Sequence, residues 1–221
     1  MCFERAIDAD PKCAMAYWGA GYASGPNYNM PWDLFDYAGR AAAARAGYAN
    51  ARKALDMIDG VTRWEAALIN ALPARYPQPE PLDPEVMKAW NADFTDAMRD
   101  VFAVHPESHE VRTVFAESLL NLTPWKMWDL PSGQPASGAR TVEAQKVLEE
   151  ALEGDPSALY HPGLLHLYVH LMEMSPFPEK ALKAGDALRR LVPDAGHLIH
   201  MPTHIDICLL YTSDAADEVL G

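Results

Sequence analysis

The chain has 221 residues, of which 49% are hydrophobic, and a formal net charge of −13. This apolar content is enough for a sizeable buried core, which excludes a largely disordered chain. The negative charge argues against nucleic acid as a partner, because phosphate backbones are bound by basic surfaces. No run of ~20 apolar residues is present, so the sequence predicts no membrane-spanning helix.

Helical patterns separated by proline or glycine turns follow one another in the first third of the chain. Residues 2–9 predict the end of a helix, residues 13–23 a second helix, and the alanine-rich residues 36–58 a third. The segment Thr62–Glu65 has the pattern of a capping box, which starts a helix by satisfying its first free amides. That helix is expected to end near Pro73, since proline cannot donate to the helical ladder.

The next helix is expected to begin at Asp83-Pro84, because proline is favourable at the first helical position. Its apolar residues recur at helical spacing and are expected in the core; they are Val86, Trp90, Phe94, Met98 and Val101. Residues 110–122 predict another helix, and residues 125–139 a polar loop.

An amphipathic helix is expected at residues 140–153, and its inward residues are predicted to be Val142, Val147, Leu148, Ala151 and Leu152. No segment alternates with period two for long enough to predict a strand. The sequence therefore predicts an all-α fold.

Six of the eight histidines lie between His161 and Asp206. Two H-x3-H pairs, His166/His170 and His200/His204, are offset by 34 residues. This offset is the period of the tetratricopeptide repeat, in which each unit is a helix–turn–helix. Residues one period apart occupy equivalent places on stacked helices, so the spacing predicts a ladder of histidines.

Four strings carry a resemblance to a known family: FERAIDADPKCAMAYWGAGYA, NLTPWKMWDL, HPGLLHLYVHLMEMSP and LVPDAGHLIHMPTHID. Together they resemble a group of bacterial and fungal tetratricopeptide-repeat proteins. The resemblance implies an α-solenoid of stacked antiparallel helix pairs whose inner surface is a groove for partners. It covers most of residues 2–207, and we expect residues 1–207 to be part of a longer helical array that is incomplete at both ends.

The last residues of the chain have a different character. Residues 208–218, CLLYTSDAADE, resemble the translation of one reading frame of an adapter used to prepare sequencing libraries. We therefore expect residues 208–221 to be a non-native tail without a part in function.

The histidine stretch supports two alternative interpretations. On a helix, His166, His170 and Glu173 share one face, and H-x3-H with a nearby carboxylate is spacing that suits zinc or a similar divalent metal. His200 and His204 are expected to contribute from the next repeat. Alternatively, the histidines are polar groups of a groove that hydrogen-bond to one another, to backbone or to a bound peptide. Pro202 also interrupts the second pair, because the residue before proline avoids the α region.

The function favoured by the sequence is a scaffold that binds a protein or peptide on its concave face and needs no cofactor. Trp125, Trp128, His161 and His197 are the residues expected to line this groove. The alternative is a metal-binding protein or metal-dependent enzyme built on the histidines. No GxSxG, P-loop or GxGxxG motif is present, and the three cysteines form no CxxC pair, so no other catalytic residue is predicted. The sequence does not indicate a cellular location.

Overall fold

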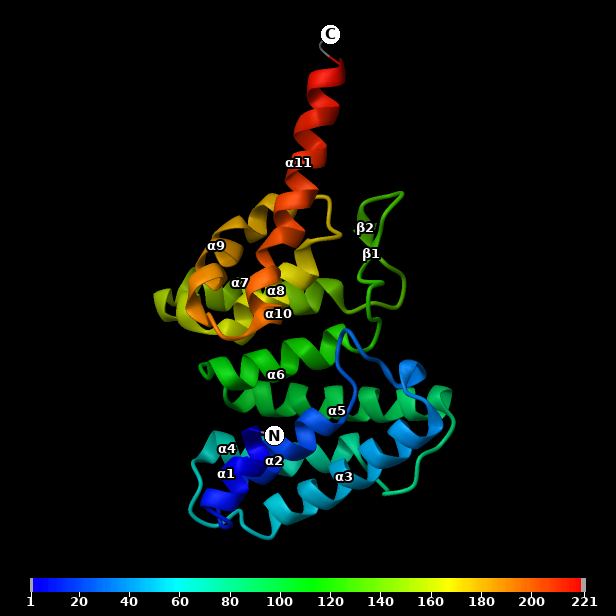
Figure 1. Ribbon diagram of the computed structural model, residues 1–221, viewed down its shortest axis with the longest axis vertical. Coiled ribbons are helices and arrows are strands. Elements are labelled where there is room, and N and C mark those ends of the chain that lie inside the picture. The colour runs from blue at the N-terminus through cyan, green and yellow to red at the C-terminus, as the bar shows by residue number, and fades with distance from the viewer. Residues whose placement is uncertain (1, 220–221) are drawn as a thin grey trace. The chain divides into compact units, whose positions relative to one another are not determined.

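The computed structural model describes the backbone of residues 2–219 and the side chains of residues 2–210. It is mostly helical, which confirms the predicted all-α class, and it divides into two compact units, Met1–Pro124 and Trp125–Gly221. The strands found in the described part are two residues long each (Figure 1). No helix among the described residues is long and apolar enough to cross a membrane.

The first unit consists of helices that pack against their neighbours in sequence: α1 on α2, α2 on α3, α4 on α5 and α5 on α6 (Figure 1). Its α-helices are α1 (Cys2–Ala9), α2 (Ala14–Ser24), α3 (Tyr37–Leu55), α4 (Arg63–Ala71), α5 (Pro84–Val104) and α6 (His109–Leu120). Two short 3₁₀ helices, η1 (Trp32–Leu34) and η2 (Leu72–Arg75), lie in the connections.

The starts of these helices follow local sequence signals. The predicted capping box is confirmed: the Thr62 side chain accepts from the Glu65 amide, and the Glu65 carboxylate accepts from the Thr62 amide. The predicted start of α5 is also confirmed, since the Asp83 carboxylate accepts from Glu85 and Pro84 is the first helical residue. Each cap satisfies amides that the helix itself leaves without a partner.

One expected core residue of α5 is on the surface. Trp90, Phe94, Met98 and Val101 are buried as predicted, but Val86 is 50% exposed. At 100° per residue, Val86 lies about 80° around the helix from Phe94, whereas Met87 lies only about 20° away. Met87 is accordingly the fully buried residue in that turn.

The second unit begins with a short hairpin and continues as helices. Its α-helices are α7 (Thr141–Gly154), α8 (Pro162–Met172), α9 (Leu182–Leu191), α10 (Gly196–His200) and α11 (Pro202–Val219). The 3₁₀ helices are η3 (Pro156–Tyr160) and η4 (Pro178–Ala181), and the antiparallel strands are β1 (Trp128–Asp129) and β2 (Gln134–Pro135). Helix α8 packs on α7 and α9, and α11 lies beside α8 and α9 (Figure 1).

Two details of this unit differ from the sequence expectations. The loop at 125–139 contains the β1–β2 hairpin, which is too short to leave a period-two pattern. Val142 is 65% exposed, although it was expected to face inward. It lies in the first turn of α7, where Thr141 and Ala144 take the buried positions. Val147, Leu148 and Ala151 are buried as predicted, and Leu152 is half-buried.

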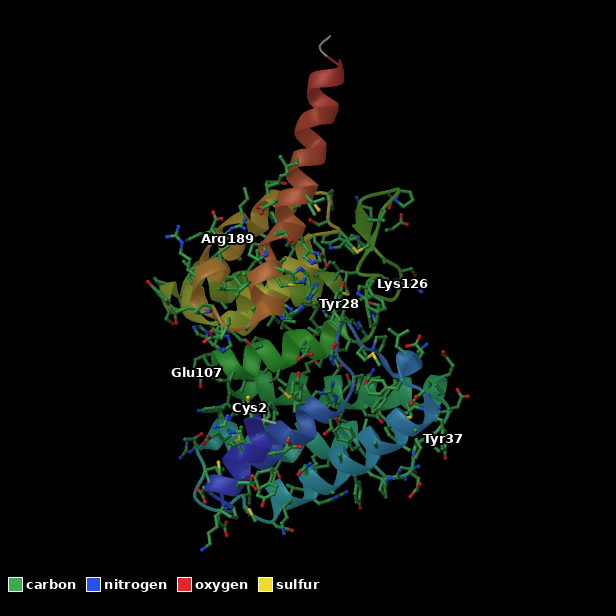
Figure 2. All side chains as sticks on the ribbon, in the orientation of Figure 1. Cys2, Tyr28, Tyr37, Glu107, Lys126 and Arg189 are labelled. Carbon is green, nitrogen blue, oxygen red and sulfur yellow. The ribbon has the colours of Figure 1, made fainter. Side chains whose placement is uncertain are left out.

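The expected tail, residues 208–221, lies partly outside the described residues. Helix α11 continues through residue 219, while residues 220–221 and the side chains from residue 211 onward are not described. Before that point, Arg189 of α9 joins α11 through Asp206, with Nη2 2.6 Å from each carboxylate oxygen. Figure 2 labels Arg189, which belongs to α9. The pair fixes the start of α11 on the second unit.

Candidate metal centre

Helix α8 carries the first two histidines and is buried on nearly every side. The His161 side chain caps its start by accepting from the Leu164 amide at 3.3 Å, and Pro162 is its first residue. His170 is only 3% exposed and His166 is half-buried. The face of α8 that carries these histidines is covered in part by α11, which contacts α8, and by His197 of α10, which lies against His166.

The covering segment consists of α10 and the first turn of α11. Pro202 begins α11, so His200 ends one helix and His204 belongs to the next. Met201 and Ile205 are buried and hold the segment on the unit. A break at Pro202 is present as the sequence indicated, but the stated reason is wrong, because Met201, the residue before the proline, has α-helical dihedral angles (φ −52°, ψ −41°). The break places His200 and His204 on different helices.

Three imidazoles converge between α8 and α10. Nε2 of His166 lies 3.0 Å from Nε2 of His197, and the His166 and His170 rings are 4.6 Å apart between centroids. One nitrogen from each of these three residues lies within 4.8 Å of the other two. Nitrogen ligands around a tetrahedral zinc ion are separated by ~3.3 Å, given Zn–N bonds of ~2.0–2.1 Å. Small side-chain rotations would therefore bring the three nitrogens onto one ion.

Glu173 lies directly after α8 and contacts two of the histidines. Its Oε1 is 3.0 Å from Nδ1 of His170, and its Oε2 contacts Nδ1 of His204. The Glu173 side chain is 11% exposed, so this carboxylate is largely removed from water. A carboxylate accepts hydrogen bonds, so each Nδ1 carries the proton, and in a neutral imidazole Nε2 then carries the lone pair. Glu173 thus orients His170 and His204 so that each could bind a metal ion through the lone pair on Nε2.

The environment favours the neutral form of two of the convergent histidines, His166 and His197. Burial, together with repulsion from the neighbouring imidazoles, lowers the pKa of His166 to about 3. The same causes lower the pKa of His197, which is more exposed. A metal ion binds the deprotonated imidazole, and these two are therefore ready to bind at neutral pH without losing a proton.

The remaining two histidines continue the cluster toward solvent. The His200 ring lies 5.2 Å from the His197 ring and 4.9 Å from the His204 ring, between centroids. The His170 and His204 rings, which are one 34-residue period apart, lie 6.1 Å apart. At this end of the cluster, the Cys208 thiol donates to the backbone oxygen of Glu173 at 3.0 Å.

The structure brings all the sequence-predicted metal residues into one cluster but gives them different places. His166 and His170 converge, while Glu173 contacts imidazole nitrogens and His200 and His204 lie farther along. The third convergent residue is His197, which the sequence assigned to a partner groove. The H-x2-H spacing of His197 with His200 is the feature of the sequence that indicates this role, whereas the 34-residue period relates the other two pairs.

The predicted partner groove is not assembled as expected. Trp128 is buried, and its indole nitrogen donates to the Leu171 backbone oxygen at 2.6 Å, so it anchors the hairpin to α8. His161 caps α8, and His197 belongs to the histidine cluster. Trp125 is 41% exposed. Binding of a protein or peptide partner stays a prediction.

Comparison of the chain with protein-family models, with curated proteins and with solved structures finds no match. Function is therefore inferred from the geometry of the histidine cluster.

Proposed function

We propose that the second unit binds a divalent transition-metal ion through His166, His170 and His197. The observation that carries this proposal is the convergence of three imidazole nitrogens within 4.8 Å of one another. Neutral imidazoles can hydrogen-bond to one another, as His166 and His197 do, and their remaining lone pairs point into a space that an ion could share. Bringing them together is favourable when an ion occupies the space between them.

The donor set supports a borderline metal such as zinc. Imidazole suits zinc, copper, nickel and iron, whereas magnesium and calcium prefer oxygen ligands. Glu173 supplies the outer carboxylate that commonly orients a metal-binding histidine and offsets part of the ion's charge. Three protein ligands leave one position of a tetrahedral ion for water, which is the ligand count of catalytic rather than structural zinc sites. This favours a site that exchanges a ligand or activates water.

Calorimetric titration with zinc chloride tests the proposal, on protein purified without a metal-affinity tag and stripped by a chelator. We expect at least one tight zinc ion per chain. His166→Ala/His197→Ala should lose this ion, and both residues are accessible enough to be replaced without opening the core. His105→Ala, which removes a histidine from the first unit, should bind as the unaltered protein does. Equal titration curves for all three proteins would overturn the proposal.

We also propose that the helices are organised as repeats of the tetratricopeptide type. The contacts between sequence neighbours, such as α2 with α3 and α8 with α9, support this arrangement. The proximity of His170 to His204, one period apart, supports it in the second unit. A crystal structure of the chain tests it: non-equivalent surroundings for successive helix pairs would overturn it.

A further inference from the structure

The proposed ion leaves three groups of the cluster without a ligand role. His200 and His204 lie 4.9 Å apart between ring centroids, which resembles the 4.6 Å separation of His166 and His170. The second oxygen of Glu173 is the third such group, and it contacts Nδ1 of His204. The cluster thus offers five imidazoles and one carboxylate, which exceeds what one tetrahedral ion uses.

Glu173 contacts one histidine from each of the pairs His166/His170 and His200/His204. One of its oxygens contacts His170 and the other contacts His204, through Nδ1 in both cases. Nε2 of His204 therefore carries a lone pair that can bind a metal ion, for the same reason as Nε2 of His170. Glu173 would then orient a ligand of the first ion with one carboxylate oxygen and a ligand of a second ion with the other.

We infer that the cluster is a dinuclear centre, in which a second divalent ion binds His200 and His204 beside the first. This inference rests on the proposed function. His200 is exposed and His204 is half-buried, so the second ion has an open path from solvent and room for water ligands. The proximity of His197 to His200, at 5.2 Å between rings, makes the two ions neighbours.

The two ions should bind in order. The first has three imidazoles, and the second has two together with water, so the first is held more tightly. The second dication is also repelled by the first, and one carboxylate offsets only part of this repulsion. We therefore expect the second ion to bind more weakly by on the order of tenfold or more.

Counting zinc ions on the full chain by native mass spectrometry, during a titration with zinc alone, tests the inference. The unaltered protein should take up two ions in succession. His200→Gln/His204→Gln should take up one ion with the affinity of the first site, because glutamine keeps a donor for Glu173 but is a poor metal ligand. His166→Ala/His197→Ala should retain only the weaker ion. Circular dichroism checks that each variant has the helical content of the unaltered protein.

The outcomes separate the two proposals. One ion on both the unaltered protein and His200→Gln/His204→Gln overturns the dinuclear centre and leaves the single site intact. Two ions on His200→Gln/His204→Gln also overturn it, because the second ion then binds elsewhere. No ion on the unaltered protein overturns both. The control variant His105→Ala should bind the same number of zinc ions as the unaltered protein. This result would exclude a general effect of removing a histidine.

Discussion

Glu173 is the residue on which the geometry of the histidine cluster depends most. Its carboxylate accepts from His170 and contacts His204. In Glu173→Gln the amide nitrogen cannot accept, so one of the two histidines loses its orientation. We expect the affinity for zinc to fall by about 10–100-fold, as is typical when an outer carboxylate is removed. Calorimetric titration measures it.

The control for this prediction is Glu179→Gln, which removes the same charge from an exposed side chain of η4. A loss of affinity in both variants would mean that the net charge of the unit, rather than the orientation of the imidazoles, determines zinc binding. Unchanged affinity in Glu173→Gln would contradict the role assigned to this carboxylate.

We expect the protein to lose stability at high pH because Tyr76 is buried. Its hydroxyl donates to the Gly21 backbone oxygen at 2.8 Å, and burial, reinforced by repulsion from Glu117, raises its pKa to about 12. The unfolded chain releases this proton near pH 10, so the free energy of unfolding should fall as the pH rises from about 10 to about 12. Each unit of pH in this window costs about 1.4 kcal/mol for this one group.

Tyr76→Phe isolates this contribution. Urea unfolding at several values between about pH 9 and pH 11 should show a shallower decline for the variant than for the unaltered protein. The variant should also be less stable at neutral pH by about 1 kcal/mol, since the Gly21 oxygen loses its donor. Parallel curves would show that the phenol ionises equally in both states.

At the same scale, the sequence predicts which histidines share a helix but not which histidines meet. The helical period is sufficient to place His166, His170 and Glu173 on one face. The position of His197 depends on the turn after α9 and on the packing of α10, and neither has a local signal. The burial of His170 has the same origin, because it results from the segment that covers α8.

Among the elements, α3 packs closely against Tyr76, the residue that follows η2, at Gly47. A Cβ on Gly47 would clash with atoms of the Tyr76 ring, closer than any van der Waals contact permits. Tyr76 is fully buried and held by its hydrogen bond, so it cannot move aside. In Gly47→Ala, overpacking costs about 1–3 kcal/mol, while the better helix propensity of alanine returns up to about 1 kcal/mol. The clash prevails, and we expect a net loss of about 1–2 kcal/mol in urea unfolding.

Gly154→Ala is the matched control for this substitution. A Cβ at Gly154, the last residue of α7, meets nothing within 4 Å. Its effect should stay within about 0.5 kcal/mol, as for other surface changes. A stability equal to that of Gly47→Ala would mean that the space beside Gly47 is larger than the structure indicates.

The elements themselves were largely predictable because their ends carry local chemistry. The Thr62 capping box and the Asp83-Pro84 start need only nearby residues, and both are confirmed. Val86 and Val142 fit a periodic pattern but are exposed, because the buried positions of their turns are taken by Met87 in α5 and by Thr141 and Ala144 in α7. The β1–β2 hairpin depends on Trp128 donating to the far end of α8, a contact 43 residues away that no local pattern shows.

For the whole molecule, the boundary between residues 124 and 125 has consequences for function. Every residue of the histidine cluster belongs to the second unit, and its members come from two segments, 161–173 and 196–206. The first unit has its own buried groups, among them Arg75, whose guanidinium lies against the Tyr22 and Phe94 rings. An ion bound at the histidines should therefore stabilise one unit and leave the other unchanged.

Hydrogen exchange followed by mass spectrometry tests this expectation on the full chain. Zinc at about 100 times its dissociation constant stabilises the folded form by about 2.7 kcal/mol, which slows exchange through opening of the second unit by about 100-fold. Protection should appear in peptides from α8, α10 and the start of α11, because these elements carry the ligands. Peptides from α2 to α6 should exchange at the same rate with and without zinc, and His166→Ala/His197→Ala should show much weaker protection, because it retains only the weaker ion. Equal protection in both units would mean that they open together, and the ion would then stabilise the whole chain as one cooperative structure.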